Sequence, residues 1–364
     1  MHEEYMQQAL NIARYALGRT SPNPLVGAVV VRDGRIVGQG WHRKSGTPHA
    51  EVHALRQAGE LADGATIYVT LEPCSHYGRT PPCSQAIIDA GIKTVVVAMT
   101  DPNPLVAGNG LKMLREAGIE VIEGILTEEA MKLNEVFLKW IKTKMPFVVL
   151  KTAMTLDGKI ATASGESKWI TNDTSRKLVH EMRDIYDSIL VGIGTVLNDN
   201  PSLTTRLGEC GKNPVRVIVD SMARTPLNAN VVDGSAPTII AVTDKAPSAK
   251  IKALKEKGVE VVMVATKNDQ VDLQSLFALL GERKISSVFV EGGATINEML
   301  LKENLVDKVH VFIAPKIIGG KTAPTPIGGH GITALKDACM LKNMTTKIID
   351  GDILITAYVS DKEN

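Results

Sequence analysis

The sequence predicts a protein built from two α/β domains, and three observations support this prediction. The chain has 364 residues, which is well above the ~150 residues of a typical domain. Strand patterns alternate with helix patterns in both halves, as is typical of layered α/β folds. The alternation breaks at KTKMP (142–146), where proline disfavours continuation of the preceding helix. We therefore expect one domain over residues 1–145 and a second over residues 146–364.

In the first domain, helices and strands follow one another along the chain. Residues 3–17 place apolar side chains at helical spacing, among them Tyr5, Leu10 and Leu17. The runs VGAVVV and RIVGQGW have strand composition and are separated by the short turn 32–34. We expect helices at 3–17, 50–57, 84–90, 111–117 and 128–141, and strands at 26–31, 35–41, 66–71, 94–99 and 119–124.

The second domain shows the same alternation of strands and helices. Segments such as SILVG, VRVIVD and SVFVEG have strand composition. We expect strands at 147–151, 188–192, 215–220, 238–243, 259–264, 287–292, 309–314 and 353–359, and helices near 174–186, 247–257, 272–281 and 294–302.

Composition and charge exclude several classes of function. The chain has 41 basic and 40 acidic residues, a net charge of +1, whereas a general polyanion binder carries a basic stripe. Aromatic residues make up only 4%, too few for a base-stacking platform. No apolar run approaches the ~18 residues of a membrane helix, and the acidic start MHEEYMQQAL does not resemble a signal peptide. We expect a cytoplasmic protein without a disulfide framework.

One histidine and two cysteines form the motif with the clearest chemistry. The tetrapeptide PHAE (48–51) is followed by Cys74 and Cys83, each preceded by proline. An imidazole and two thiolates are the three protein ligands of a catalytic zinc whose fourth position is left for water. Zinc lowers the pKa of that water, and Glu51 beside His49 could carry protons between water and substrate. This arrangement is typical of zinc-dependent base deaminases.

The spacing departs from the generic motif, because eight residues instead of two separate Cys74 from Cys83. Cys83 could still open a helix, where the helix dipole and free N–H groups favour a thiolate. His49 and Glu51 are two residues apart, so they converge only if His49 stands at the start of its helix. Pro48 favours that placement.

Other residues of the ligand types are weaker candidates. His53 and His76 are alternative zinc ligands, but each is more simply explained as a helix-surface or loop histidine. Cys210 and Cys339 lie in the second half, and we expect them to take no part in the zinc site.

Three segments of the first half together resemble the bifunctional deaminase-reductases of riboflavin biosynthesis. They are SPNPLVGAVVV (21–31), GWHRKSGTPHAEVHAL (40–55) and TLEPCSHYGRTPPC (70–83), and the long cysteine spacer is that family's own variant. The resemblance implies a cytidine-deaminase-like α/β/α layered domain. It implies deamination of 2,5-diamino-6-(5-phosphoribosylamino)pyrimidin-4-one at a ring amino group. The implied zinc ligands are His49, Cys74 and Cys83, with Glu51 as the proton shuttle.

The same resemblance implies a substrate pocket lined by Asn23, His42, Arg79 and Asn103. Asparagine amides can hydrogen-bond to a pyrimidine edge, and His42 or Arg79 can meet a phosphate. The alternative is that Asn23 and Asn103 are turn residues, since each precedes a proline.

The second half lacks the dinucleotide-binding motif G-x-G-x-x-G. Gly192 and Gly194 follow a strand, but Leu197 occupies the third glycine position. Gly292 and Gly293 instead lie between a strand and a helix, where backbone N–H groups could approach a diphosphate. A plain strand-to-helix turn is the alternative.

Four segments of the second half are similar to the reductase half of the same family. They are KTAMTLDGKIA (151–161), SKWIT (167–171), VGIGTVLNDNPSLTTR (191–206) and VEGGATINE (290–298). The resemblance then spans residues 3 to about 358. It implies a dihydrofolate-reductase-like α/β domain that uses NADPH to reduce the ribosyl group to ribityl, with hydride delivered to C1 of the opened sugar.

By motif position, the resemblance also implies the residues that line the two parts of the reductase site. The expected cofactor contacts are Ala153, Trp169, Thr195, Asp199, Ser221, Gly293, Ala294, Thr295, Ile296 and Asn297. The expected substrate contacts are Ser167, Arg183, Leu203, Arg206 and Glu291.

Several of these residues have an evident chemical use. Arg183 and Arg206 suit the 5′-phosphate, because a guanidinium can bind two phosphate oxygens at once; the alternative for Arg183 is an exposed helix arginine. Lys151 and Asp199 are candidates for handling protons at the opened sugar.

Preference for NADPH over NADH requires a partner for the 2′-phosphate of the cofactor. Ser221 and Arg224 both follow the strand VRVIVD, and the resemblance favours Ser221. For Trp169, packing in a core is the alternative to packing along the cofactor.

The sequence therefore predicts two consecutive reactions on a small phosphorylated pyrimidine, with zinc and NADPH as cofactors. It predicts no nucleic-acid or membrane partner, and the family resemblance implies a homo-oligomer. One alternative is a nucleic-acid base deaminase with an unrelated second domain, which the balanced charge and few aromatic residues disfavour. Another is a regulatory binding protein without catalysis, which the intact zinc motif disfavours.

Overall fold

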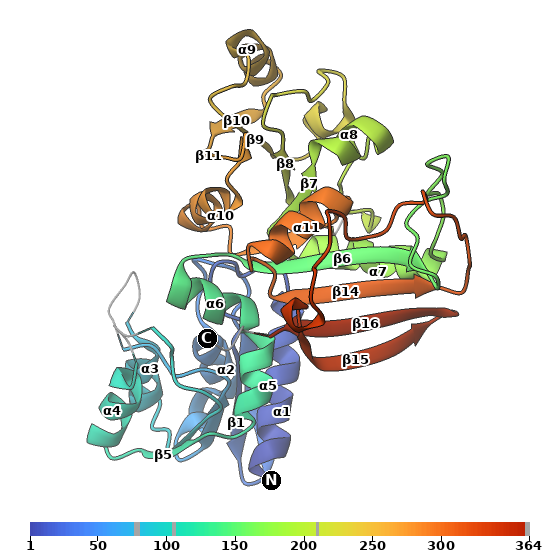
Figure 1. Cartoon of the computed structure of the whole chain (residues 1–364). Coiled ribbons are helices and arrows are strands. Elements are labelled where there is room, and N and C mark those ends of the chain that lie inside the picture. Colours follow the sequence, from blue (N-terminus) through green and yellow to red (C-terminus); the bar gives the residue numbers. More distant parts are fainter. Residues whose placement is uncertain (76–80, 104–106, 209–210, 361–364) are drawn as a thin grey trace. The chain divides into compact units, whose positions relative to one another are not determined.

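The computed structural model describes residues 1–75, 81–103, 107–208 and 211–360 (Figure 1). The chain divides into two compact units, Met1–Lys144 and Met145–Asn364. Each unit combines helices with a β-sheet, so the predicted α/β class is confirmed. Among the described helices, none has both the length and the apolar character needed to cross a bilayer.

The first unit is built on a five-stranded sheet. Its strands are β1 (Gly27–Arg32), β2 (Arg35–Trp41), β3 (Thr66–Val69), β4 (Thr94–Val97) and β5 (Glu120–Glu123). Its α-helices are α1 (His2–Ala13), α2 (Ala50–Ala58), α3 (Cys83–Asp89), α4 (Asn109–Glu116), α5 (Thr127–Leu133) and α6 (Glu135–Thr143), with 3-10 turns at Arg14–Ala16 and Gly59–Ala62. The strand order is β2-β1-β3-β4-β5. β1 is antiparallel to both its neighbours, and β3, β4 and β5 are parallel.

Two glycines let helices approach this sheet closely from opposite faces. A Cβ atom on Gly27 would lie 2.0 Å from the carbonyl oxygen of Ala9 in α1, and one on Gly40 would lie 2.4 Å from that of Ala50 in α2. Gly40 pairs with Ala28, the neighbour of Gly27, and successive side chains of a strand point to opposite faces. Helices α1 and α2 therefore cover opposite faces, which gives the predicted α/β/α layers.

The second unit is built on a larger sheet. Its strands are β6 (Phe147–Thr155), β7 (Ser188–Gly192), β8 (Val215–Val219), β9 (Thr238–Val242), β10 (Glu260–Met263), β11 (Thr266–Lys267), β12 (Gln270–Val271), β13 (Ser287–Val290), β14 (Lys308–Ala314), β15 (Leu341–Ile349) and β16 (Asp352–Val359). Its α-helices are α7 (Asp173–Ile185), α8 (Ile193–Asp199), α9 (Ser248–Glu256), α10 (Leu273–Glu282) and α11 (Ala294–Lys302), with 3-10 turns at Asn230–Val232 and Leu335–Asp337.

Nine of these strands form one sheet in the order β10-β9-β8-β7-β13-β6-β14-β16-β15. The strands from β10 to β14 are parallel, and β16 and β15 complete the sheet in antiparallel pairs. In Figure 1, β6, β14, β16 and β15 lie side by side at one end of this sheet. Parallel strands end at a common edge, so the segments after β7 and β13 meet where α8 and α11 begin. Ligands of open α/β sheets usually bind at that edge.

Several elements differ from the sequence predictions, among them the short strands β11 and β12, which were not expected. The helix expected over 128–141 is divided at Asn134 into α5 and α6. Helix α8 follows β7 directly. No helix was predicted at this position, because the sequence pattern showed only glycines after a strand. Strand β15 was not predicted, because its residues from Leu341 to Ile348 are exposed and show no alternation of apolar and polar side chains.

Candidate active sites

In the first unit, one histidine and two cysteines converge. His49 caps the N-terminus of α2, Cys83 is the first residue of α3, and Cys74 lies in the segment after β3. Their ligand atoms all lie within 4.8 Å of one another. His49 Nδ1 is 3.2 Å from Cys83 Sγ and 3.6 Å from Cys74 Sγ. Tetrahedral zinc with bonds of about 2.0–2.3 Å would separate nitrogen and sulfur ligands by about 3.6 Å. The three donors therefore fit one zinc ion.

Both predicted helix starts are confirmed. His49 has ψ 168, an extended conformation immediately before the helix, so its side chain and that of Glu51 are not forced to opposite faces. Glu51 is 3% exposed, and its Oε2 has no hydrogen-bond partner among the described residues. Burial raises the pKa of Glu51 to about 7. A carboxyl group with such a pKa can take up and release a proton near neutrality.

Hydrogen bonds also connect the two cysteine segments directly. The Cys83 backbone N–H donates to Cys74 Sγ at 3.3 Å, and the N–H and Oγ of Ser84 donate to the Cys74 carbonyl at 3.2 and 3.0 Å. The hydrogen bond shared with Cys83 lowers the pKa of Cys74 to about 4, while the same bond raises the pKa of Cys83. The ends of the connection between the cysteines are therefore fixed together.

Two predicted pocket residues lie beside the metal ligands. The His42 ring meets the His49 ring edge-on with centroids 5.4 Å apart, and its Nε2 is 3.4 Å from Asn23 Nδ2. His42 is buried, and burial lowers its pKa, which favours the neutral ring. The backbone N–H of Asn103 donates to Asp101 Oδ1 at 2.9 Å.

The remaining candidates of this half do not join the ligand cluster. His53 lies on α2 outside the three-residue metal cluster found among the described residues. Arg79 and His76 lie outside the described residues, as does Cys210. Cys339 is exposed in the second unit.

Glu72 is a site residue that sequence reasoning did not single out. It is 4% exposed, and it accepts hydrogen bonds from the N–H groups of Asp101, Gly108 and Gly110 at 3.1, 3.0 and 3.0 Å. It therefore anchors the segment that carries Asn103 to the end of β3. A signal was present, since an acidic residue directly after a buried strand needs donors.

Asn134 anchors a second pocket segment. Its Oδ1 accepts from the N–H of Leu25 at 2.8 Å, and its Nδ2 donates to the carbonyl of Leu25 at 3.0 Å. Leu25 follows Asn23 in the same loop. No local sequence signal identifies this contact, because the partners are 109 residues apart.

In the second unit, the predicted contacts gather in a cleft of about 620 Å³. Ten of the residues expected at the reductase site line it: Lys151, Ala153, Ser167, Trp169, Arg183, Asp199, Leu203, Arg206, Glu291 and Asn297. Six others are not among its lining residues: Thr195, Ser221, Gly293, Ala294, Thr295 and Ile296. The last four lie at the start of α11.

Some of the cofactor candidates outside the cleft are near one another. Thr195 Oγ1 lies 3.6 Å from the position that a Cβ atom on Gly293 would occupy, so the starts of α8 and α11 are adjacent.

The Asn297 side chain is buried, with Oδ1 unpartnered among the described residues and Nδ2 bonded to the Pro326 carbonyl at 2.9 Å. Ser221 Oγ accepts from the N–H of Val271 at 3.1 Å.

A buried ion cluster occupies the centre of the cleft. Arg183 Nε and Nη2 donate to Glu291 Oε1 and Oε2 at 2.6 and 3.1 Å, and Lys151 Nζ lies 3.4 Å from Oε2. Burial by itself would raise the pKa of Glu291, but the charges of Arg183 and Lys151 outweigh it and hold the pKa at about 2. With two cations and one carboxylate, the cluster therefore carries a net charge of +1.

The two arginines predicted for the phosphate differ in their surroundings. Arg183 also donates from Nη1 to the Thr204 carbonyl at 3.0 Å, so all three of its nitrogens have protein partners. Arg206 is exposed and makes no hydrogen bond or ion pair with a described residue. Arg206 is thus the one of the two whose guanidinium is open to a phosphate.

Several cleft residues were not singled out from the sequence, among them Arg176 and His180. Arg176 lies 4.5 Å from the ring centroid of Trp169, which is 60% exposed, so that tryptophan is not a core residue. The Nδ1 of His180 is buried without a hydrogen-bond partner among the described residues, and burial, with the nearby charge of Arg183, lowers the pKa of His180. Both lie on α7, whose buried residues have the ordinary spacing of a helix with one buried face. This pattern does not by itself indicate a binding site.

Comparison with known proteins identifies relatives of both units. A model of the cytidine and deoxycytidylate deaminase zinc-binding region matches residues 1–99, and a model of the RibD C-terminal domain matches residues 146–355. The riboflavin biosynthesis protein RibD of Actinobacillus pleuropneumoniae is 49% identical over 359 residues, covering 98% of this chain and 95% of that protein. The chain belongs to the RibD family.

Solved structures of RibD proteins agree with this. Acinetobacter baumannii RibD has a TM-score of 0.89 at 40% identity, covering 99% of each chain. A Thermotoga maritima diaminohydroxyphosphoribosylaminopyrimidine deaminase/5-amino-6-(5-phosphoribosylamino)uracil reductase has a TM-score of 0.87 at 42% identity, again over 99% of each chain. As a RibD protein, the chain is a bifunctional deaminase and reductase of riboflavin biosynthesis that uses zinc and NADPH.

Proposed function

We propose that each unit performs one reaction on the same pyrimidine. The first unit removes a ring amino group from 2,5-diamino-6-(5-phosphoribosylamino)pyrimidin-4-one, and the second reduces the ribosyl group of the product to ribityl. The observation that carries the proposal is the meeting of His49, Cys74 and Cys83 around one point. The buried carboxyl of Glu51 lies two residues after His49 in the sequence and interacts with it electrostatically.

In the deaminase, zinc held by His49, Cys74 and Cys83 would polarise a water molecule and lower its pKa. Glu51 takes a proton from the attacking water while the water oxygen bonds to the ring carbon. Glu51 then gives this proton to the ring amino group, and the amino group leaves as ammonia. The raised pKa of Glu51 suits both transfers, because neither protonation state is strongly favoured near neutrality.

Substrate recognition in the deaminase is assigned to residues around the ligands. Asn23 and Asn103 would hydrogen-bond to the pyrimidine edge, and His42 and Arg79 would contact the substrate phosphate. The support is positional, since His42 packs against His49 and Asn23 lies beside His42. Glu72 and Asn134 hold the two loops that carry the asparagines.

In the reductase, NADPH supplies the hydride. Opening of the ribosyl ring requires a proton at the ring oxygen, and we assign this transfer to Lys151, with Asp199 as the second proton-handling residue. Both line the cleft, and Glu291 holds the Lys151 ammonium in place at 3.4 Å.

The remaining reductase contacts follow the cleft. Arg206 is assigned to the 5′-phosphate, with Ser167, Leu203 and the Arg183–Glu291 pair around the sugar. The cofactor would lie along Ala153, Trp169 and Asp199 and reach the start of α11, where N–H groups can bind its diphosphate. Thr195 faces that start, and Ser221 is assigned to the 2′-phosphate.

A combined assay on the purified protein tests the proposal. The diaminopyrimidine ribotide is supplied, and ammonia release and NADPH oxidation are followed together. We expect ammonia release without NADPH, and NADPH oxidation only after ammonia release or on deaminated substrate. NADPH oxidation on the undeaminated ribotide at the same rate would contradict the proposed order.

We also propose that the chain acts as a homo-oligomer in the cytoplasm. The support is the edge strand β15, whose residues are exposed from Leu341 to Ile348, including apolar Met344 at 65% and Ile348 at 76%. An exposed apolar edge strand is a favourable surface for pairing with another chain.

A further inference from the structure

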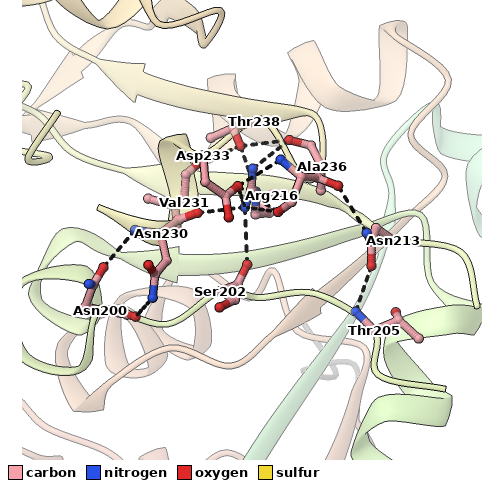
Figure 2. A network of polar contacts seen from close by, with 11 residues as sticks. Asn200, Ser202, Thr205, Asn213, Arg216, Asn230, Val231, Asp233, Ala236 and Thr238 are labelled. Atoms are coloured by element: carbon pink, nitrogen blue, oxygen red, sulfur yellow. Dashed lines mark hydrogen bonds and ion pairs between the residues drawn. The ribbon is translucent and has the colours of Figure 1, made fainter. Parts of the chain in front are cut away.

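Arg216, at the start of β8, is a buried cation that neither proposed reaction uses. Its side chain is fully buried, yet it donates to six acceptors (Figure 2). Nε donates to Thr238 Oγ1 at 2.8 Å, Nη2 to the Ala236 carbonyl at 2.7 Å, and Nη1 to Asp233 Oδ1 at 3.0 Å. A buried guanidinium is costly unless its donors are bonded, so these acceptors must be held in a fixed arrangement.

Most of these acceptors belong to one segment, the connection between β8 and β9. Besides Asp233 and Ala236, Arg216 Nη1 reaches the Asn230 carbonyl at 3.0 Å and Ser235 Oγ at 3.3 Å. The guanidinium therefore fixes the course of the segment 230–236. The remaining bond is to the Ser202 carbonyl at 3.3 Å, outside that segment.

Ser202 lies in the loop 200–206, which we call the substrate loop. Two hydrogen bonds donated by Asn230 to Asn200 join its start to the segment 230–236, as Figure 2 shows. The N–H of Asn230 donates to Asn200 Oδ1 at 2.8 Å, and Asn230 Nδ2 donates to the Asn200 carbonyl at 2.7 Å. Because the Asn230 carbonyl is bonded to Arg216, the guanidinium acts on Asn200 through Asn230.

A second asparagine joins the other end of the substrate loop to the same segment. Asn213 Oδ1 accepts from the N–H of Thr205 at 2.9 Å, and Asn213 Nδ2 donates to the Ser235 carbonyl at 3.2 Å (Figure 2). The substrate loop is thus bonded at Asn200, Ser202 and Thr205 to groups that Arg216 organises.

Between these bonded positions, the substrate loop presents side chains to the reductase cleft. Leu203 and Arg206 line the cleft, as does Asp199 just before the loop. Asn200, Pro201, Ser202 and Asn230 also border the cleft, whereas Arg216 and Asn213 do not. Leu203 has a positive φ of 53 and Asn200 one of 41, conformations that non-glycine residues adopt only when their surroundings hold them. The bonds to Asn200 and Ser202 supply that restraint.

We propose that Arg216 is a positioning residue of the reductase. Through Asn230 and Asn213, it holds the substrate loop in the conformation that presents Leu203 and Arg206 to the substrate. This inference rests on the proposed role of Arg206 in binding the substrate. Arg216 touches neither substrate nor cofactor, and its effect is transmitted by hydrogen bonds alone.

The test uses Asn230→Ala in the full-length protein, because Asn230 is exposed and its replacement leaves the Arg216 contacts to its backbone in place. Asn228→Ala is the matched control, since Asn228 is also exposed and its side chain has no hydrogen bond to a described residue. Loss of the hydrogen bond from the Asn230 amide to the substrate loop is expected to raise the reductase KM for the deaminated ribotide about fivefold. We expect kcat within about twofold and unchanged ammonia release, as the effect is confined to substrate positioning.

The split between KM and kcat separates positioning from stability. A purely structural role would reduce the amount of active protein and so lower the apparent kcat while KM stayed unchanged; that outcome for Asn230→Ala would overturn the inference. Asn213 does not line the cleft, so Asn213→Ala, with the same expected rise in KM, separates loss of positioning from loss of a direct contact at Asn230; an unchanged KM in Asn213→Ala would contradict the positioning role. Arg216→Lys, which retains the charge but not the fork of donors, should show the largest rise; if it does not fold, the asparagine variants decide.

Arg206→Ala distinguishes this inference from the function on which it rests. If Arg206→Ala raises the KM and the asparagine variants do not, the positioning role is wrong and the phosphate role stands. If Arg206→Ala leaves the KM unchanged and the asparagine variants raise it, the substrate loop acts through Leu203 and the phosphate role is wrong. If none of them changes the KM, both are wrong.

Discussion

Glu291 binds Arg183 through both carboxylate oxygens, with N–O distances of 2.6 and 3.1 Å, inside the reductase cleft. The pair also sets the place of Lys151, whose Nζ lies 3.4 Å from the same carboxylate. A two-nitrogen contact of this kind depends on the planar fork of arginine, which lysine lacks.

Arg183→Lys should therefore damage reduction and spare deamination. A lysine ammonium can meet only one carboxylate oxygen well, so Glu291 and Lys151 would lose their fixed positions. We expect reductase kcat/KM to fall by about 10- to 100-fold, measured by NADPH oxidation on the deaminated ribotide. Normal reductase activity would show that the pair does not organise the cleft.

Glu51→Gln should abolish ammonia release while zinc remains bound. The amide has nearly the same shape as the carboxyl group but cannot shuttle protons, and a general acid-base residue typically contributes about 10²–10⁴-fold. Zinc content measured by elemental analysis verifies that the ligands are intact. Glu60→Gln, at an exposed position of the same unit, is the control and should retain full activity.

Removal of zinc should separate the two activities. A chelator is expected to stop ammonia release, because His49, Cys74 and Cys83 then hold no metal. NADPH oxidation on pre-deaminated substrate should continue, since the reductase cleft lies in the other unit. Equal loss of both activities would show that the second site also depends on the metal.

His310 on β14 should make stability depend on pH. It is 7% exposed, its Nδ1 is 2.9 Å from Thr356 Oγ1, and burial lowers its pKa to about 4. The unfolded chain, with a histidine pKa near 6.5, binds the proton first as the pH falls, so stability is lost from about pH 6.5 down to about 4.

The expected loss between pH 7 and pH 5 from this group is about 2 kcal/mol in the free energy of unfolding. Urea unfolding at the two pH values measures this loss. His310→Gln keeps a hydrogen-bonding side chain but does not titrate, so its free energy of unfolding should fall by about 2 kcal/mol less than that of the parent protein. His330→Gln, at an exposed position, is the control and should follow the parent. Identical pH dependence in all three proteins would contradict the assignment.

Strand β15 should govern the oligomeric state. Lysine at Ile348 or Met344 would place charge on the exposed apolar edge, and we expect a smaller species in light scattering coupled to size-exclusion chromatography. Lys347→Gln, on the same strand, is the control. If both charged variants keep the parent's mass, the oligomer forms elsewhere or the protein is a monomer.

The sequence predicted those parts of the sites that lie close together along the chain. His49 and Glu51 are two residues apart, and Cys74 and Cys83 are separated by one short connection, so residue type and spacing were sufficient. The helix starts at His49 and Cys83 followed from the prolines before them. Glu291 and the glycines after it directly follow β13, but only the family resemblance, and not their spacing, assigned them to the site.

The parts that could not be predicted depend on distant partners. Asn134 breaks a helix pattern because its amide bonds to Leu25, 109 residues away. Arg183 had the pattern of an exposed helix arginine, yet Glu291, its partner, is 108 residues further on. Arg216 lies in a strand pattern where a buried cation is unexpected. In each case a long-range polar contact overrides the local preference.

The connection between Cys74 and Cys83 has a consequence for how such enzymes can diversify. Its two ends are bonded to each other, by Cys83 N–H to Cys74 Sγ and by Ser84 to the Cys74 carbonyl. Residues can therefore be added or removed between the ends without moving either ligand. Doubling the length of such a loop costs only about 0.6 kcal/mol of closure entropy. The metal centre and the length of this connection can thus evolve separately, and changes in the connection would alter the phosphate contact proposed for Arg79 while leaving the zinc ligands in place.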